Sequence, residues 1–212
     1  PLIYINILFF YRLIYNMGYC NNKHNKIEEK YENPIDTLII KFIECFDNNV
    51  MKLHTDPNYI TIFRFILVVV FWIKFTKNKS KTNAVFFASI FLFNYFLDCV
   101  DGYLARKCDT VTEFGDYLDH IADVIGGLLI ISTLYPFKDF EIILILIFTF
   151  LGVAYMGCQQ KIYNKSDKIK ETLDYFKPLC FCNIKKLRYF SVATTCIVYA
   201  LLFLNRFVFK KF

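Results

Sequence analysis

Four aspartates stand in two pairs on either side of a short connecting stretch. Asp98 and Asp101 are three residues apart, and Asp119 and Asp123 are four apart, so each pair shares one face of a helix. Four carboxylates that face each other cannot all stay ionised unless a cation lies between them. Oxygen ligands favour Mg²⁺, Mn²⁺ or Ca²⁺, and four aspartates can hold two ions about 4 Å apart, which suits phosphoryl displacement.

The residues between the two pairs suit a phosphate or a flat ligand. Gly102 and Gly115 let a backbone or a ligand come close. Arg106 can present a planar fork to a phosphate, and Ala105 leaves space beside it.

His120 directly follows Asp119, and an imidazole beside bound metal ions suits a general base. A purely structural histidine is the alternative. The remaining acids do not share the faces of the two pairs, so we expect solvated loop charges at Asp109, Glu113 and Asp116.

Strongly apolar segments flank this acidic stretch. The chain has 212 residues, of which 56% are hydrophobic, which is too apolar for an ordinary soluble domain. Several runs approach the roughly 20 residues needed to cross a bilayer. A soluble helical core could explain one run, but five leave too little polar surface. We therefore predict an all-α integral membrane protein with spans at Tyr59–Thr76, Thr82–Leu97, Leu118–Tyr135, Phe140–Gly157 and Tyr189–Val208.

The N-terminal region, residues 1–57, is expected to be separate from the transmembrane domain, residues 58–212. Residues 1–16 are apolar and precede Met17, so they are either a further hydrophobic helix or sequence upstream of the true start. A helical apolar face follows, which predicts an amphipathic helix at the membrane interface, with a helix packed on a soluble partner as the alternative. Its residues are Ile35, Leu38, Ile39, Phe42, Ile43 and Phe46.

The net charge of +6 is unevenly distributed. Lysines are concentrated between the fourth and fifth predicted spans, on the same side as the acidic stretch if the spans alternate. The positive-inside bias therefore favours a cytosolic acidic stretch, and the basic surface would attract anionic lipid headgroups. Nothing in the chain resembles a nucleic-acid-binding module.

The eight cysteines include no CxxC pair, and several lie in or beside predicted spans. We expect small buried hydrophobic side chains here, and neither a disulfide framework nor a zinc site.

The spacing Asp98-x2-Asp101-Gly102-x2-Ala105-Arg106-x8-Gly115-x3-Asp119-x3-Asp123 resembles the signature of the CDP-alcohol phosphatidyltransferases and fills every fixed position. The stretch PNYIT, Pro57–Thr61, also resembles the segment that enters the family's first helix. The resemblance implies about six transmembrane helices around a polar cavity open to the cytosol. It also implies a reaction in which an alcohol acceptor displaces CMP from a CDP-linked lipid or CDP-alcohol in the membrane.

The same resemblance implies a role for each matching residue. Asp98, Asp101 and Asp119 would hold two divalent cations, Mg²⁺ or Mn²⁺, and Asp123 would complete the metal site or take the proton from the alcohol. The nucleotide site would be lined by Gly102, Ala105, Arg106 and Gly115. Five predicted spans fall short of six, so residues 1–16 or Leu173–Cys182 would supply the sixth.

The branch of the family stays open. Asp119-His120 resembles enzymes that transfer from CDP-choline or CDP-ethanolamine to diacylglycerol, whereas the short chain fits enzymes that use CDP-diacylglycerol. We expect a phospholipid synthase of unspecified headgroup, in the endoplasmic reticulum or another endomembrane if the source is eukaryotic. A homodimer is one candidate assembly. The alternative of another class is a catalytically inactive protein that binds cations or nucleotides, although such a protein would be expected to lose at least one aspartate.

Overall fold

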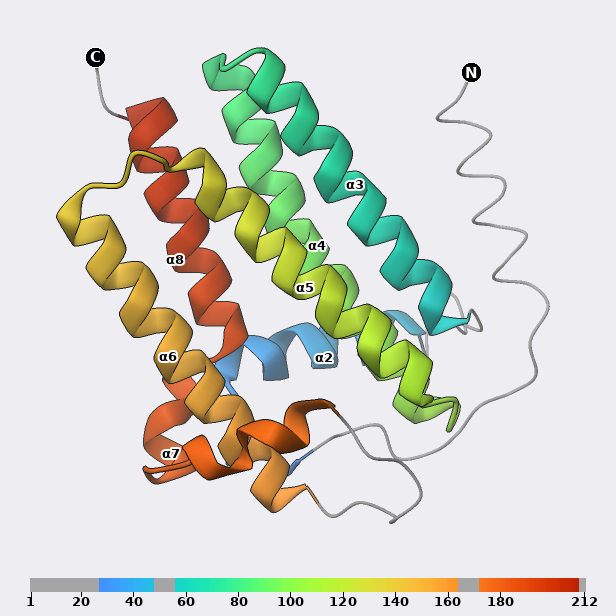
Figure 1. Ribbon diagram of the computed structural model, residues 1–212. Helices are drawn as coiled ribbons and strands as arrows, with labels where there is room; N and C mark the ends of the chain where they lie inside the picture. Colours follow the sequence, from blue (N-terminus) through green and yellow to red (C-terminus); the bar gives the residue numbers. More distant parts are fainter. Residues whose placement is uncertain (1–26, 48–55, 164–171, 210–212) are drawn as a thin grey trace.

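The computed structural model describes residues 27–47, 56–163 and 172–209, and these residues form helices and no strands. The longer helices lie side by side as a bundle, and one short helix crosses it (Figure 1). In chain order the elements are α2 (Pro34–Phe46), α3 (Pro57–Lys77), α4 (Lys81–Lys107), α5 (Glu113–Thr133), α6 (Asp139–Ile162), the 3₁₀ helix η2 (Thr172–Leu179), α7 (Ile184–Leu187), the 3₁₀ helix η3 (Arg188–Phe190), α8 (Val192–Leu204) and the π-helical turn η4 (Asn205–Phe209).

Local capping starts α3 and α5 at the same end of the bundle. The Asp56 side chain accepts a hydrogen bond from the Asn58 backbone N–H, and Pro57 fills the first helical position, where no N–H is needed. The Thr112 hydroxyl caps α5 by accepting from the Gly115 N–H at 3.0 Å. These two starts meet the C-terminal half of α4, so one end of the bundle collects residues from three helices.

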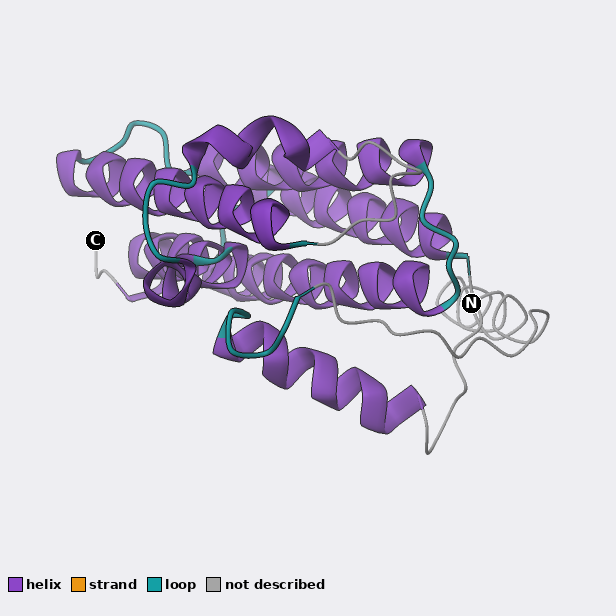
Figure 2. Cartoon of the chain, turned by 90° about the horizontal axis from the view of Figure 1, so that it is seen from below, coloured by secondary structure: helices purple, strands orange, loops and turns teal. Residues whose placement is uncertain are grey.

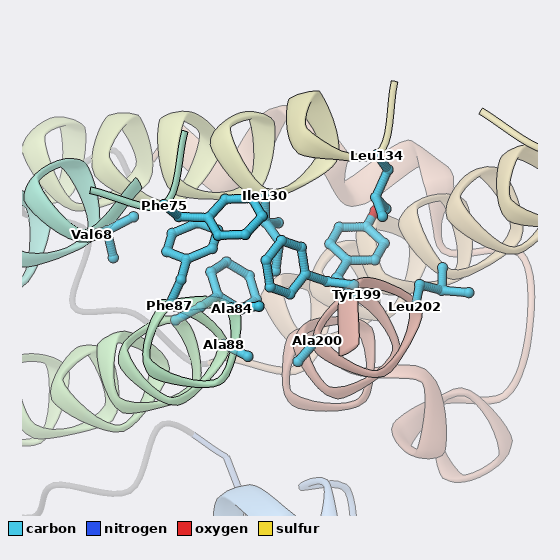
Figure 3. Close-up of a cluster of buried hydrophobic side chains, with 12 residues drawn as sticks. Val68, Phe75, Ala84, Phe87, Ala88, Ile130, Leu134, Tyr199, Ala200 and Leu202 are labelled. Atoms are coloured by element: carbon cyan, nitrogen blue, oxygen red, sulfur yellow. The ribbon is translucent and has the colours of Figure 1, made fainter. Parts of the chain in front are cut away.

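The opposite end of the bundle is held by an apolar core. Phe75 of α3 and Phe87 of α4 stack with ring centroids 5.9 Å apart, and the ring of Phe203 of α8 lies edge-on to both at 4.9 and 5.3 Å. Figure 3 shows this cluster between the ribbons, together with Ile130 of α5 and Leu134, the residue that follows this helix. Aromatic pairs in these arrangements stabilise a core beyond the area they bury.

Among the described residues, four helical segments are long and apolar enough to cross a membrane. They confirm an all-helical membrane architecture, but the expected count of about six spans is not confirmed. Residues 1–16 lie outside the described part of the chain. The four segments are α3, α4, α6 and the run Ile184–Phe209, which contains α8.

α5 corresponds to the third predicted span but is not among these four segments. Asp119 and Asp123 lie on the side of α5 that faces α3. Its other side carries an exposed apolar stripe that runs down the helix at intervals of three and four residues. The stripe consists of Phe114, Tyr117, Ile121, Val124 and Leu128. α5 therefore presents an apolar surface outward even though its acidic residues lower its mean hydropathy.

α2 lies outside the bundle, as the view from below shows (Figure 2), and two polar anchors attach it to α4. The Tyr95 hydroxyl donates a hydrogen bond to Asp36 near the start of α2. At the other end, buried Asp47 pairs with Lys107 and accepts from the Tyr103 hydroxyl at 3.0 Å. Burial raises the pKa of Asp36 to about 6, and hydrogen bonding to Tyr95 offsets part of that effect.

The helix predicted here is present as α2, and its predicted apolar residues lie on both its buried and its exposed sides. Ile43 is buried against α3 and α4, whereas Leu38 and Phe42 are 69% and 61% exposed. The exposed side chains leave an apolar face for the membrane interface, which stays a prediction.

η2 packs tightly against the C-terminal half of α6. A Cβ atom on Gly157 would lie only 2.1 Å from the Phe176 carbonyl oxygen, so the glycine permits a backbone approach that no other residue would allow. This approach places Cys180 beside Cys158, and the two form a disulfide with Cα atoms 4.7 Å apart. The expectation that the cysteines form no disulfide was therefore wrong, because the contact depends on a glycine in a different helix. The segment Leu173–Cys182, one candidate for a sixth span, lies largely within η2.

Candidate active site

The guanidinium group of Arg64 lies among all four aspartates. Its Nε is 3.2 Å from Asp101, its Nη1 is 2.7 Å from Asp123, and its Nη2 is 2.9 Å from Asp98 and also contacts Asp119. The Arg64 side chain has no exposed surface. A buried guanidinium is stable only with such partners, so the five side chains form one unit that we call the Arg64 cluster.

Three helices build the Arg64 cluster. α3 supplies Arg64, the C-terminal half of α4 supplies Asp98 and Asp101, and the first turns of α5 supply Asp119 and Asp123. The structure thus brings together the two aspartate pairs that the sequence spacing placed on facing helices.

Three of the carboxylates form a group that could hold a metal ion. One oxygen each from Asp98, Asp119 and Asp123 lies within 4.8 Å of the others, and these side chains are 21% to 33% exposed. The donors are all carboxylate oxygens, which fits Mg²⁺ or Mn²⁺. Asp101 differs because it is 3% exposed and accepts a 2.7 Å hydrogen bond from Thr61 as well as the Arg64 contact.

A pocket opens beside the cluster where α3 and α5 begin and α4 ends. All four residues predicted for the nucleotide site line it, together with Asp101 and Asp119. Other lining residues are Pro57, Asn58, Thr61, Thr110, Val111, Thr112, Asp116, His120 and Tyr163. The pocket therefore joins the predicted nucleotide residues to the carboxylates in one continuous surface.

The two pocket glycines make room for neighbouring side chains. A Cβ on Gly115 would lie 2.9 Å from the Asn58 amide oxygen and 3.1 Å from the Thr112 hydroxyl. A Cβ on Gly102 would lie 3.1 Å from Nη1 of Arg106, so the guanidinium group of Arg106 lies over this glycine. Each glycine thus lets a polar side chain approach a helix backbone at the pocket wall.

His120 is held by α5 and η2 together. Its Nδ1 is 2.7 Å from the Asp116 carbonyl oxygen and 2.7 Å from the Thr172 hydroxyl. A carbonyl oxygen can only accept, so this contact places the proton on Nδ1 and leaves the lone pair on Nε2. The ring lines the pocket with one nitrogen anchored and the other available.

The prediction of solvated loop acids holds in full for Asp109, which is exposed in the α4–α5 connection. Glu113 is exposed as predicted, but it is the first residue of α5 and not part of a loop. Asp116 lies inside the first turn of α5, and its carboxylate accepts a 2.7 Å hydrogen bond from the Thr172 N–H, with 11% of the side chain exposed. The loop assignment of Asp116 was therefore wrong, because α5 starts earlier than hydropathy predicted.

The residues that the sequence interpretation missed are mostly on α3. Arg64, Thr61 and Asn58 recur every three residues and face the pocket or the cluster. The available signal was an arginine inside an otherwise apolar span, since ionisable residues in such spans usually serve a function. Thr172 carried no comparable signal.

The bundle and its site define a helical membrane protein with a cluster of carboxylates that could hold a metal ion beside a polar pocket. The family description CDP-alcohol phosphatidyltransferase matches residues 54–210, about three quarters of the chain. The chain belongs to this family, which confirms the resemblance seen in the aspartate signature. No solved structure matches the chain.

Curated relatives share one name, CDP-diacylglycerol–glycerol-3-phosphate 3-phosphatidyltransferase. The relative from Wigglesworthia glossinidia brevipalpis is 42% identical over 86 residues, which cover 38% of this chain and 46% of the relative. The relative from Rickettsia felis is 40% identical over 67 residues, or 32% and 36% of the two chains. The relative from Pseudomonas fluorescens is 41% identical over 69 residues, or 32% and 34%. The matched part of the chain thus spans a third to a half of each relative's length.

Proposed function

We propose that this chain transfers a phosphatidyl group from CDP-diacylglycerol to a small polar alcohol and releases CMP. The observation that carries the proposal is the continuity of the carboxylate cluster with the pocket that contains the signature residues. The relatives named above act, by their names, on CDP-diacylglycerol and glycerol 3-phosphate, so glycerol 3-phosphate is the first acceptor to test.

Asp98, Asp119 and Asp123 would hold divalent cations through the carboxylate oxygens that lie within 4.8 Å of one another, and Asp101 would support them from its buried position. Bound Mg²⁺ or Mn²⁺ supplies charge neutralisation for a pyrophosphate and for the departing CMP. Asn58, Thr112 and Arg106 offer hydrogen-bond partners along the pocket wall for the nucleotide.

Two residues are candidates for the base that takes the proton from the alcohol. Asp123 lies in the cluster itself, whereas His120 lines the pocket with Nε2 free to accept a proton. An unchanged rate for His120→Ala would assign the base role to Asp123 and leave the histidine a structural role.

CMP release by the purified chain in mixed detergent and lipid micelles tests the reaction class. One arm contains Mg²⁺ or Mn²⁺, CDP-diacylglycerol and either glycerol 3-phosphate, inositol or serine. The second arm contains CDP-choline or CDP-ethanolamine with diacylglycerol. We expect EDTA-sensitive CMP release in the first arm alone. CMP release in the second arm alone would overturn the substrate assignment, and no release in either arm would favour a binding protein.

Two substitutions test the carboxylates against a matched control. Asp98→Asn and Asp119→Asn each remove one charge and one metal-binding oxygen, so we expect a loss of at least about 100-fold in CMP release. Asp109→Asn is the control, because Asp109 is exposed in the same acidic stretch with φ of 52°, a conformation that asparagine also adopts. Full activity in either cluster variant would refute the metal assignment.

A further inference from the structure

The guanidinium group of Arg64 lowers the negative charge of a site that we propose to hold divalent cations. With all four aspartates ionised, the cluster would carry three negative charges, because one guanidinium, fully buried among its partners, offsets the fourth. Arg64 therefore occupies a central position in the cluster and cancels one of the four charges that would otherwise attract cations.

Each aspartate shares its oxygens between Arg64 and other partners. Asp98, Asp119 and Asp123 each direct their Oδ1 to the guanidinium, which leaves each Oδ2 for another partner. Asp101 directs its Oδ2 to both Arg64 and Thr61. The planar fork of the arginine thus fixes the orientation of three partly exposed carboxylates at once, which a lysine could not do.

We propose that Arg64 is a positioning residue that makes binding of the second divalent cation depend on the nucleotide. This inference rests on the proposed function. A first divalent cation leaves the cluster with one negative charge. A second cation alone would give the cluster a net charge of +1 around a fully buried guanidinium, which is unfavourable. The pyrophosphate of a nucleoside diphosphate supplies the missing negative charge, so the second cation and the nucleotide bind together.

Mn²⁺ stoichiometry measured by equilibrium dialysis tests this coupling without any turnover. The full chain in detergent at pH 8 is dialysed against Mn²⁺ alone, against Mn²⁺ with CDP, or against Mn²⁺ with cytidine, which has no phosphate. We expect one bound ion per chain with Mn²⁺ alone or with cytidine, and two with CDP. Two bound ions with Mn²⁺ alone would overturn the proposal, even if the variant below did not fold.

Substitutions at Arg64 separate its charge from its shape. Arg64→Gln removes the positive charge that offsets one of the four carboxylates. We therefore expect two bound ions without nucleotide, with the second ion bound at least about tenfold more tightly than in the wild-type chain. Arg64→Lys keeps the charge but loses the fork. It should keep the wild-type stoichiometry and bind the first ion about tenfold more weakly. Lys74→Gln, on the exposed side of α3, is the matched control and should behave as wild type.

The outcomes distinguish this inference from the proposed function. Wild-type stoichiometry in Arg64→Gln would refute the charge argument while leaving the enzyme assignment intact. Absence of Mn²⁺ binding in the wild-type chain under every condition would instead refute the metal site and with it the proposed function.

Discussion

Gly157→Ala places a methyl group where η2 meets α6. The added Cβ would lie 2.1 Å from the Phe176 carbonyl oxygen and 2.9 Å from its carbonyl carbon. These neighbours are backbone atoms, so no side-chain rotation can relieve the clash. The segment itself must move away from α6.

The size of this movement follows from the distances. Ordinary carbon–oxygen contacts are about 3.3 Å, so η2 must shift by about 1 Å at Phe176. The Cys158–Cys180 disulfide restrains the C-terminal end of η2, so part of the shift reaches Thr172 at the other end. Thr172 contacts His120 and Asp116 at the pocket, where a misplacement of about 1 Å can cost up to about 100-fold in rate.

Two measurements follow the effect. We expect Gly157→Ala to lower CMP release by about tenfold or more and to destabilise the chain by about 1–3 kcal/mol, the usual cost of overpacking. Thermal unfolding in detergent measures the loss of stability. Gly127→Ala is the matched control, because it makes the same change inside α5 with no atom within 4 Å of the new Cβ.

The control removes the general effect of replacing a helical glycine by alanine, which favours the helix. If Gly157→Ala matches Gly127→Ala in both rate and thermal midpoint, the close approach of η2 to α6 is not needed for the site. The argument that η2 positions pocket residues would then be refuted.

Asp36 and Gly115 give two further predictions. The folded state keeps the Asp36 proton up to about pH 6, whereas the unfolded chain releases it near 3.8, so stability falls by about 2 kcal/mol as the pH rises from 4 to 6. In Asp36→Asn the amide oxygen can still accept the hydrogen bond from Tyr95, but the side chain no longer titrates. The variant should therefore lose this pH dependence of thermal unfolding, and a pH dependence equal to that of the wild type would contradict the prediction. Gly115→Ala should raise the KM for the CDP substrate several-fold with little change in kcat, because Asn58 must move away from the new Cβ; an unchanged KM would contradict this.

Periodicity and hydropathy predicted the helices that carry the site but not their ends. The second predicted span stopped at Leu97, yet α4 continues to Lys107. In this last part Asp98 and Asp101 pair with Arg64, and Lys107 pairs with buried Asp47. α5 likewise begins at Glu113, five residues before the predicted span, where the Thr112 cap sets its start. Hydropathy falls wherever a span carries functional charge, so it underestimates such helices.

The four aspartates could be predicted as a group because their spacing alone places each pair on one helical face. Arg64 could not be paired with them from sequence, since its partners are 34 to 59 residues away. The contact of Thr172 with His120 spans 52 residues and depends on how η2 packs on α6. Long-range contacts of this kind follow from tertiary packing, which no local pattern encodes.

The apolar stripe on α5 has a consequence for the depth in the membrane at which the proposed reaction would take place. The stripe begins at Phe114, before every aspartate that α5 contributes to the cluster, and Asp123 lies about 13 Å further along the helix. With that stripe against lipid, the carboxylates would lie below the level of the surrounding headgroups, and water would reach them through the pocket. A lipid substrate could then keep its tails in the bilayer while the water-soluble alcohol and the cations reach its phosphate through the pocket.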